Sequence, residues 1–217
     1  MITHLSEWAK RKPQAPFFCV QGDKQSIEYS YRRAHIAAAA LARELERYGM
    51  TANGTLACTM YNGTELVLLS LAAAYGGYTL ALLNPRLSAD ERQLRLVELE
   101  NATGEHGMDV LTNQMVNRLL IDATGFDATG FGLLPDDAAV LTRLQVELEQ
   151  TVQRYQERFD GDNAGLVMFT SGSSGTPKAA FLTWNSLMGS AAGANEVLRY
   201  EEHGVWQMVL PLCHVGC

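Results

Sequence analysis

Positive charge is scarce in this sequence of 217 residues, which has only four lysines and a net charge of −7 at pH 7. Proteins that bind nucleic acid or anionic lipid usually gather lysine and arginine on one face or in one cluster. The sequence contains no such basic stripe. We therefore expect neither nucleic acid nor an anionic membrane surface as a partner.

Cysteine is also rare, and Cys19, Cys58, Cys213 and Cys217 are scattered along the chain. A chain of this length can bury a core that needs no disulfides, so the pattern is typical of free thiols in a reducing compartment. Residues 1–12 carry charges and no long apolar stretch, unlike a secretory signal peptide. These features predict a cytoplasmic protein.

One uncharged stretch, residues 66–83, has the length of a membrane span. A glycine pair, Gly76 and Gly77, interrupts it, and an Asn-Pro pair follows it. A helix, a turn and a strand explain these glycines, whereas a continuous span does not. The stretch therefore predicts no membrane span but a buried helix and a buried strand, at residues 66–75 and 78–83.

The remaining helices and strands follow from apolar spacing and turn residues. Residues 34–48 show apolar side chains at spacings of three and four, and Ser88 with Glu91 forms a capping-box pattern. We expect further helices at residues 4–12, 34–48, 88–100, 136–159 and 184–198. We expect further strands at residues 17–21 and 26–29, as a hairpin, and at 55–60, 107–112, 166–170, 178–183 and 205–210. The sequence of residues 113–135 gives no clear assignment to helices or strands. This alternation predicts a layered α/β fold with a largely parallel sheet flanked by helices.

Small residues and hydroxyls are concentrated between a strand ending at Thr170 and a strand beginning at Lys178. Gly172 and Gly175 allow close backbone approach, and successive N–H groups can form a nest for an anion. Lys178 adds a full positive charge, and Pro177 stiffens the exit. The other residues supply hydroxyl donors: Thr170, Ser171, Ser173, Ser174 and Thr176. The segment predicts a loop that holds phosphate groups, rather than a flexible linker.

Other glycine- and serine-rich loops fit less well. A Walker A loop has adjacent Gly and Lys, whereas two residues separate Gly175 from Lys178. The Gly-x-Ser-x-Gly spacing of a nucleophile elbow is absent, and a Ser-x-x-Lys pair fails because Gly175 stands three residues before Lys178. The run from Gly172 to Gly175 is similar to that of amidase-signature hydrolases. Those enzymes need an upstream catalytic lysine, and none of the three upstream lysines lies in a convincing core element.

Residues 169–178 resemble the signature of the adenylate-forming superfamily, which includes acyl-CoA synthetases, luciferases and nonribosomal adenylation domains. That signature reads aromatic-Thr-Ser-Gly-Ser/Thr-Thr-Gly-x-Pro-Lys, and Ser174 stands where Thr is usual. Residues 210–216 resemble the second motif of the family, Leu-Pro-Leu/Met-Phe-His-Val/Ile-x-Gly, with Cys213 in place of Phe. Residues 82–88 resemble the Leu-Leu-Asn-x-Arg/Lys-Leu-Ser run of o-succinylbenzoate–CoA ligases of menaquinone biosynthesis.

The resemblance implies that residues 1–217 are the N-terminal part of an AMP-binding domain and form the N-terminal subdomain of the acyl-CoA synthetase fold. In that family a carboxylic acid reacts with ATP to form an acyl adenylate, and coenzyme A then takes the acyl group. ATP, Mg²⁺, coenzyme A and a small carboxylic acid are thus the implied ligands. The loop would bind phosphates, Lys178 would act in catalysis, and His214 would border the acid pocket.

Three segments that the family uses are not in this sequence: Tyr-Gly-x-Thr-Glu, a later Thr-Gly-Asp, and a C-terminal domain with a catalytic lysine. We therefore expect a truncated chain that lacks the C-terminal domain. One hypothesis is an incomplete acid–thiol ligase, and the other is a catalytically inactive homologue that acts as a nucleotide-binding or interaction module. Because a truncated fold exposes apolar surface, we also expect association, such as a homodimer.

The order Cys213, His214, Cys217 allows two interpretations. A closed structural zinc site needs a fourth ligand, and the other two cysteines are isolated in the sequence. We favour an altered acid-pocket motif and predict no metal site.

Overall fold

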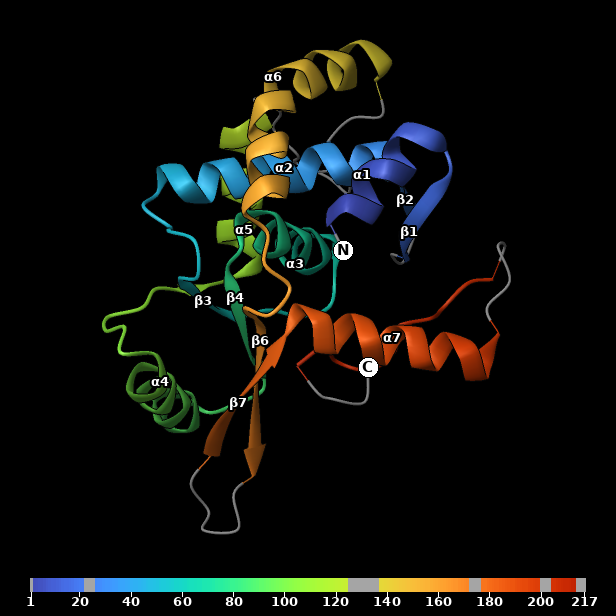
Figure 1. Cartoon of the computed structure of the whole chain (residues 1–217). Coiled ribbons are helices and arrows are strands. Elements are labelled where there is room, and N and C mark those ends of the chain that lie inside the picture. Colours follow the sequence, from blue (N-terminus) through green and yellow to red (C-terminus); the bar gives the residue numbers. More distant parts are fainter. Residues whose placement is uncertain (1, 22–25, 125–136, 172–176, 200–203, 214–217) are drawn as a thin grey trace.

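A computed structural model of the chain describes residues 2–21, 26–124, 137–171, 177–199 and 204–213. Its centre is a five-stranded sheet (Figure 1). The strand order is β5 (Val110–Leu111), β3 (Thr55–Thr59), β4 (Thr79–Leu83), β6 (Ala164–Ser171) and β7 (Pro177–Thr183). Neighbouring strands run parallel except β7, which is antiparallel to β6. The predicted α/β fold with a largely parallel sheet is confirmed.

Helices cover both faces of this sheet (Figure 1). One face carries α1 (Ile2–Arg11), α2 (Tyr31–Arg47), α3 (Thr64–Gly76), α5 (Asn113–Thr124) and α6 (Ala138–Arg158). On the other face lies α4 (Ala89–Thr103), which contacts β7. A hairpin of β1 (Pro16–Gln21) and β2 (Ser26–Ser30) precedes α2, and α7 (Trp184–Leu198) follows β7. The centre of the larger helical layer is α2, because it contacts α1, α3, α5 and α6.

Alternate residues of the parallel strands pack into two separate cores. Ala57, Ala81 and Val167 form a small cluster with Leu99 of α4. Their sequence neighbours belong to the larger core under α2 and α3: Leu56, Cys58, Leu80, Leu82 and Leu166. Side chains alternate between the faces of a strand, and here both faces are covered. As a result β4 is buried along its whole length, which is typical of a parallel sheet.

The uncharged stretch at residues 66–83 forms most of α3, a turn and β4, as the glycine pair predicts. Since α3 contacts α1, α2, α5 and α6, it is apolar on nearly every side. Gly77 adopts a φ of 70°, a conformation that side chains disfavour, and a Cβ on Gly76 would lie 2.1 Å from the ring of Tyr78. Within the described residues, no helix has the length and hydropathy needed to cross a membrane.

Most other elements lie within a few residues of their predicted bounds, and two regions differ. Residues 205–210 form no strand; Val205 is 93% exposed, and no described strand lies beside the segment to complete a hydrogen-bond ladder. That prediction is wrong. Helix α5 occupies part of the region in which the sequence showed no clear order. Its buried residues recur at helical spacing: Val116, Leu119, Leu120 and Ala123.

A buried histidine joins the two most buried helices. His35 of α2 and Tyr75 of α3 form a hydrogen bond between the imidazole Nδ1 and the phenol hydroxyl. Burial and, to a smaller extent, the nearby positive charge of Lys10 lower the pKa of His35 from 6.5 to about 4. His35 is therefore neutral in the folded protein at neutral pH.

We expect acid to destabilise the fold through His35. Below pH 6.5 the unfolded chain binds a proton at this residue, whereas the folded chain binds it only near pH 4. The free energy of unfolding should therefore fall as the pH drops from 6.5 to 4, by up to about 3 kcal/mol. Urea unfolding of the parent and of His35→Gln at pH 7 and pH 4.5 measures the effect. The variant should lose much of this pH dependence, whereas exposed His4→Gln should keep it; an equal fall with pH in His35→Gln and the parent would refute the assignment.

Candidate functional site

The strands that flank the predicted phosphate loop, β6 and β7, form a hairpin that extends beyond the rest of the sheet (Figure 1). In this hairpin Phe169 pairs with Ala179, Thr170 with Lys178, and Ser171 with Pro177. The two ends of the predicted loop are thus held next to each other by antiparallel pairing. The residues between them lie outside the described part of the chain: Gly172, Ser173, Ser174, Gly175 and Thr176.

Thr170 and Lys178 present polar groups at the base of this loop. Both residues are exposed, and the Thr170 hydroxyl donates a hydrogen bond to the carbonyl oxygen of Lys178, at 3.5 Å. None of the ion pairs formed within the described residues involves Lys178. Its ammonium group is therefore available to a ligand that carries negative charge.

The end of the hairpin that carries the loop is held by α4. Phe169 of β6 and Ala179 of β7 pack against the small cluster that contains Leu99. The backbone N–H of Ala179 also donates to the carboxylate of Glu98, at 3.4 Å. Because β7 contacts α4 and β6 pairs with β4, the hairpin has a defined direction relative to the sheet.

A glycine fixes the opposite end of the hairpin, where β7 runs into α7. Trp184, the first residue of α7, is buried over Gly165 of β6, and a Cβ at Gly165 would lie 2.4 Å from the indole ring. The backbone N–H of Trp184 donates to the Asn163 carbonyl at 3.2 Å, and that of Asn185 to the Gly161 carbonyl at 2.8 Å. The start of α7 is thereby fastened to the start of β6.

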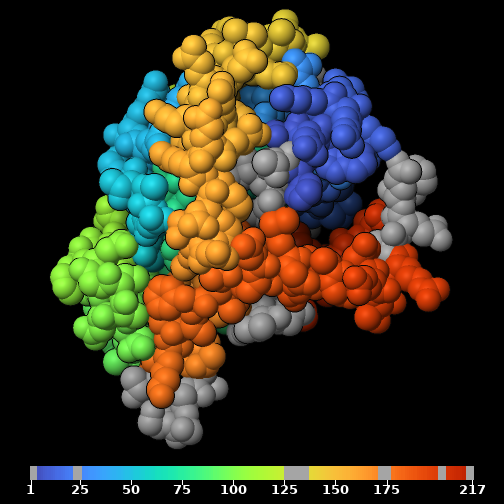
Figure 2. Space-filling view, viewed as in Figure 1, coloured from blue at the N-terminus to red at the C-terminus, as the bar shows by residue number. Residues whose placement is uncertain are grey.

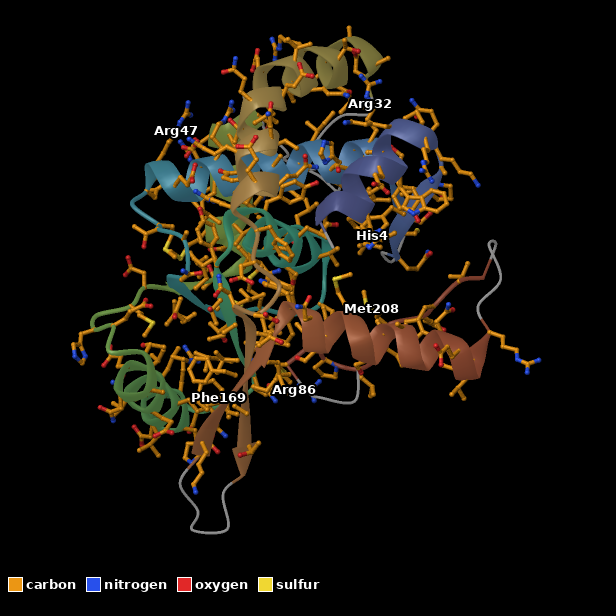
Figure 3. The ribbon with its side chains drawn as sticks, viewed as in Figure 1. His4, Arg32, Arg47, Arg86, Phe169 and Met208 are labelled. Carbon is orange, nitrogen blue, oxygen red and sulfur yellow. The ribbon has the colours of Figure 1, made fainter. Side chains whose placement is uncertain are left out.

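A second cation lies at the same edge of the sheet. Leu80 pairs with Leu166 and Ala81 with Val167, so the carboxyl end of β4 lies beside the carboxyl end of β6. Arg86 follows β4 in a turn where its backbone N–H donates to the side chain of Asn84, at 2.9 Å. Its side chain is exposed, and in the view of Figure 3 Arg86 and Phe169 are labelled at the same end of the sheet. The sequence motif at residues 82–88 contains Arg86, but the motif gave no reason to assign it to the site.

The second motif begins at the carboxyl end of β3. The side chain of Asn62 bonds to the backbone of Leu210 and Leu212, and Leu212 and Cys213 pack against the larger core. Asn62 was not predicted as a site residue, because no local sequence signal connects it to residues so far along the chain. The predicted substrate residue His214 lies outside the described residues.

The described cysteines do not form disulfides, as the sequence predicts. Burial and, to a smaller extent, the nearby Cys213 raise the pKa of the Cys58 thiol to about 12, so Cys58 is not a thiolate at neutral pH. Among the described residues there is no group of three His, Cys, Asp or Glu side chains that could hold a metal ion. Two members of the Cys213, His214, Cys217 cluster lie outside those residues, so both interpretations of the cluster remain open.

An apolar surface is exposed on α7 and the segment after it. Figure 2 shows α7 as an orange arm along one side of the molecule. This surface contains large exposed side chains: Val197, Leu198, Val205, Trp206, Met208, Val209 and Leu210. The sequence predicts such a surface for a truncated fold, and surfaces of this kind often mark contacts with other parts of a protein. The expected homodimer remains a prediction.

A family model and curated relatives both match this chain. A family model described as AMP-binding enzyme matches residues 5–217. The 2-succinylbenzoate–CoA ligase of Staphylococcus aureus strain JH9 is 26% identical over 194 residues, which cover 87% of this chain and 39% of the relative. The same enzyme of Bacillus cereus strain AH820 is 24% identical and covers 100% of this chain and 40% of the relative. The chain thus spans about two fifths of the length of the curated relatives it matches.

Solved structures show the same fold. The o-succinylbenzoate coenzyme A synthetase (MenE) of Bacillus subtilis, in complex with ATP and magnesium ion, matches with a TM-score of 0.68 at 19% identity, over 98% of this chain and 51% of that chain. A fatty acid AMP ligase from Legionella pneumophila matches with a TM-score of 0.70 at 16% identity, over 98% of this chain and 35% of that chain. These similarities confirm the predicted N-terminal subdomain fold, and they do not distinguish between acids.

We expect Gly165→Ala to destabilise the hairpin. The new methyl group would collide with Trp184, and strain of this kind in a packed region costs about 1–3 kcal/mol. Gly193→Ala is the matched control, because it lies in α7 with no atom near the added methyl group, and alanine favours a helix by about 1 kcal/mol. Urea unfolding measures both. A Gly165→Ala protein as stable as the Gly193→Ala protein would show that the close contact does not constrain the hairpin.

Proposed function

We propose, from the premise that the chain belongs to the family of AMP-binding enzymes, that it is the nucleotide- and acid-binding part of an AMP-forming acid–thiol ligase. The acid that we propose is o-succinylbenzoate. The observation that carries the proposal is the β6–β7 hairpin, which holds Thr170 and the exposed Lys178 together at the mouth of the glycine- and serine-rich loop. The named relatives and the motif at residues 82–88 support the choice of acid.

The proposed reaction has two steps. A carboxylate oxygen attacks the α-phosphorus of ATP and forms the acyl–phosphate bond of the adenylate. The bond between the α-phosphorus and the oxygen that bridges to the β-phosphate breaks, and pyrophosphate leaves. The thiolate of coenzyme A then attacks the acyl carbon, the thioester forms, and AMP leaves. Positioning and charge stabilisation dominate such phosphoryl chemistry.

The hairpin would serve the first step. Backbone N–H groups and hydroxyls of the loop would bind the β- and γ-phosphates, and the Lys178 ammonium would stabilise the charge that develops on the leaving pyrophosphate. Thr170 and Lys178, at the two ends of the loop, are held in place before the reaction, because the pairing of β6 with β7 and the contact of β7 with α4 fix the hairpin.

Mg²⁺ would reach this site together with ATP. The described residues offer no cluster of carboxylates for it, and Mg²⁺ often keeps several waters and binds mainly through substrate phosphates. It would neutralise part of the phosphate charge. Thr170 and Lys178 would then contact phosphate oxygens that the ion leaves accessible.

The acid would bind between the carboxyl ends of the strands and residues 210–214. Cys213 is smaller than the Phe of the family motif, so this wall of the pocket would have more room for the ring of an aromatic acid. Arg86 lies at the same edge with an exposed guanidinium group. We propose that it attracts the second carboxylate of o-succinylbenzoate, which the reaction does not consume.

A second candidate function is a nucleotide-binding or interaction module without ligase activity. The exposed apolar surface of α7 and residues 205–210 favours it, because that surface is suited to contact with another protein segment. The ligase and a nucleotide-binding module would both bind nucleotide through the loop and differ in whether an acid is activated, whereas an interaction module needs no nucleotide.

Calorimetry and pyrophosphate release separate these candidates. MgATP should bind to the chain more tightly than AMP, because the loop is proposed to hold the two phosphates that AMP lacks. Release of pyrophosphate with o-succinylbenzoate, but not with benzoate or succinate, would establish acid activation. Binding of MgATP without release by any acid of a wider panel would favour the module. A chain that binds MgATP no better than AMP would contradict the ligase and the nucleotide-binding module, and would favour an interaction module.

We expect Lys178→Ala to weaken MgATP binding about tenfold to a hundredfold, the usual loss for a hydrogen bond to a charged group. The stability of the fold should not change, because Lys178 is exposed and has no ion-pair partner among the described residues. Calorimetry measures the affinity and urea unfolding the stability. Lys10→Ala is the matched control, since it removes the same charge at an exposed position of α1 and should leave the affinity unchanged. Equal affinities of the two variants would remove Lys178 from the site.

A further inference from the structure

We propose that Asn62 is a positioning residue for the acid-binding side of this site. Its side-chain amide makes two hydrogen bonds of the kind that a neighbouring strand would make. These bonds hold residues 210–213 against the carboxyl end of β3. The proposal rests on the proposed function for the role of the segment as a pocket wall. The contact itself is described by the structure.

Two hydrogen bonds join Asn62 to the segment at residues 210–213. The Asn62 Nδ2 donates to the carbonyl oxygen of Leu210 at 2.8 Å, and the backbone N–H of Leu212 donates to the Asn62 Oδ1 at 3.0 Å. The partners are 148 and 150 residues away in the sequence. A single side chain therefore joins two segments that are remote along the chain.

The pattern of these bonds is that of a parallel strand pair. In such a pair one residue donates its N–H to the carbonyl before the opposing residue and accepts from the N–H after it. The Asn62 amide does this around Pro211, with Leu210 before it and Leu212 after it. The pairing makes no use of the N–H of the opposing residue, which proline lacks. The Asn carboxamide donates from its nitrogen and accepts at its oxygen. At neutral pH an Asp carboxylate cannot donate, and the shorter Ser and Ala side chains do not have two polar atoms at this reach.

The loop that carries Asn62 is itself held by neighbouring elements. It connects β3, which ends at Thr59, to α3, which begins at Thr64. The backbone N–H of Tyr61 donates to the Oδ1 of Asn113 at 3.3 Å, and the Nδ2 of Asn113 donates to the carboxylate of Glu65 at 3.3 Å. Since Asn113 begins α5 and Glu65 lies in α3, the position of Asn62 is set by three elements of the core.

The exposure of residues 204–213 changes at the point where Asn62 binds them. Residues 204–210 are exposed, whereas Leu212 and Cys213 are partly buried against the larger core. The change from exposed to partly buried occurs at the residues that Asn62 binds. Asn62 thus fixes the backbone that leads directly into the predicted substrate residue His214.

Thiol labelling of Cys213 tests the contact without any ligand. The protein is prepared with Cys217→Ser, so that the C-terminal peptide carries Cys213 as its only thiol, and alkylation by iodoacetamide is followed by peptide mass spectrometry. Exposed Cys19 and buried Cys58 are internal references for a fast and a slow thiol. Asn62→Ala should speed labelling of Cys213 by about tenfold or more, because two hydrogen bonds that hold the segment are lost.

Two further variants sharpen this test. Asn62→Asp should also speed labelling, since its carboxylate cannot donate to the Leu210 carbonyl. Asn101→Ala, an exposed residue of α4, is the matched control and should label like the parent. Unchanged labelling of Cys213 in both Asn62 variants would overturn the proposal. So would a parallel rise at Cys58, because Asn62 would then support the whole core rather than this segment.

The positioning role has its own readout. With MgATP present, o-succinylbenzoate should slow the labelling of Cys213 in the parent, and Asn62→Asp should need a higher acid concentration for the same protection while its affinity for MgATP stays the same. Equal loss of affinity for MgATP and the acid would overturn the positioning role. Absence of acid protection in the parent would contradict the proposed function, and the ligand-free labelling rates would still decide whether Asn62 holds the segment.

Discussion

The parallel pairing of β6 with β4 determines where the candidate site lies. Leu80 beside Leu166 and Ala81 beside Val167 set the register, and this register brings the Asn84–Arg86 turn next to the strand that enters the loop. The antiparallel return of β7 then places Lys178 opposite Thr170. Without the first pairing the loop would be only a hairpin tip, with no neighbouring turn and no sheet edge against which a substrate could bind.

The sequence predicted helices and strands correctly where burial produces a clear local pattern of apolar residues and glycines. The glycine pair at 76 and 77 separated a helix from a strand correctly, because one backbone conformation and one close contact require glycine there. Residues 205–210 were misinterpreted, because apolar residues of a short segment look alike whether they pair in a sheet or lie exposed. The pattern of α5 was present in the sequence and was obscured by the polar residues that follow it.

The candidate site was only partly predictable. Phosphate binding needs small residues and a cation, and these are adjacent in the sequence from Thr170 to Lys178, so this part of the candidate site could be proposed from the sequence alone. Arg86 and Asn62 depend on contacts between distant segments: the neighbour of Arg86 is set by strand order, and that of Asn62 by two hydrogen bonds. Only the folded chain shows which residues share an edge of the sheet.

The strand order has a consequence for how the protein folds. Residues 84–163, which contain α4, β5, α5 and α6, separate β4 from its partner β6. Contacts between such distant segments form late, because closing a long loop costs entropy before any contact offsets it. During synthesis the helices and strands up to β5 can assemble while β6 is still inside the ribosome. The β6–β7 hairpin, which carries Thr170 and Lys178, is therefore the last part of the sheet to form, and a nascent chain gains the candidate site only after its core.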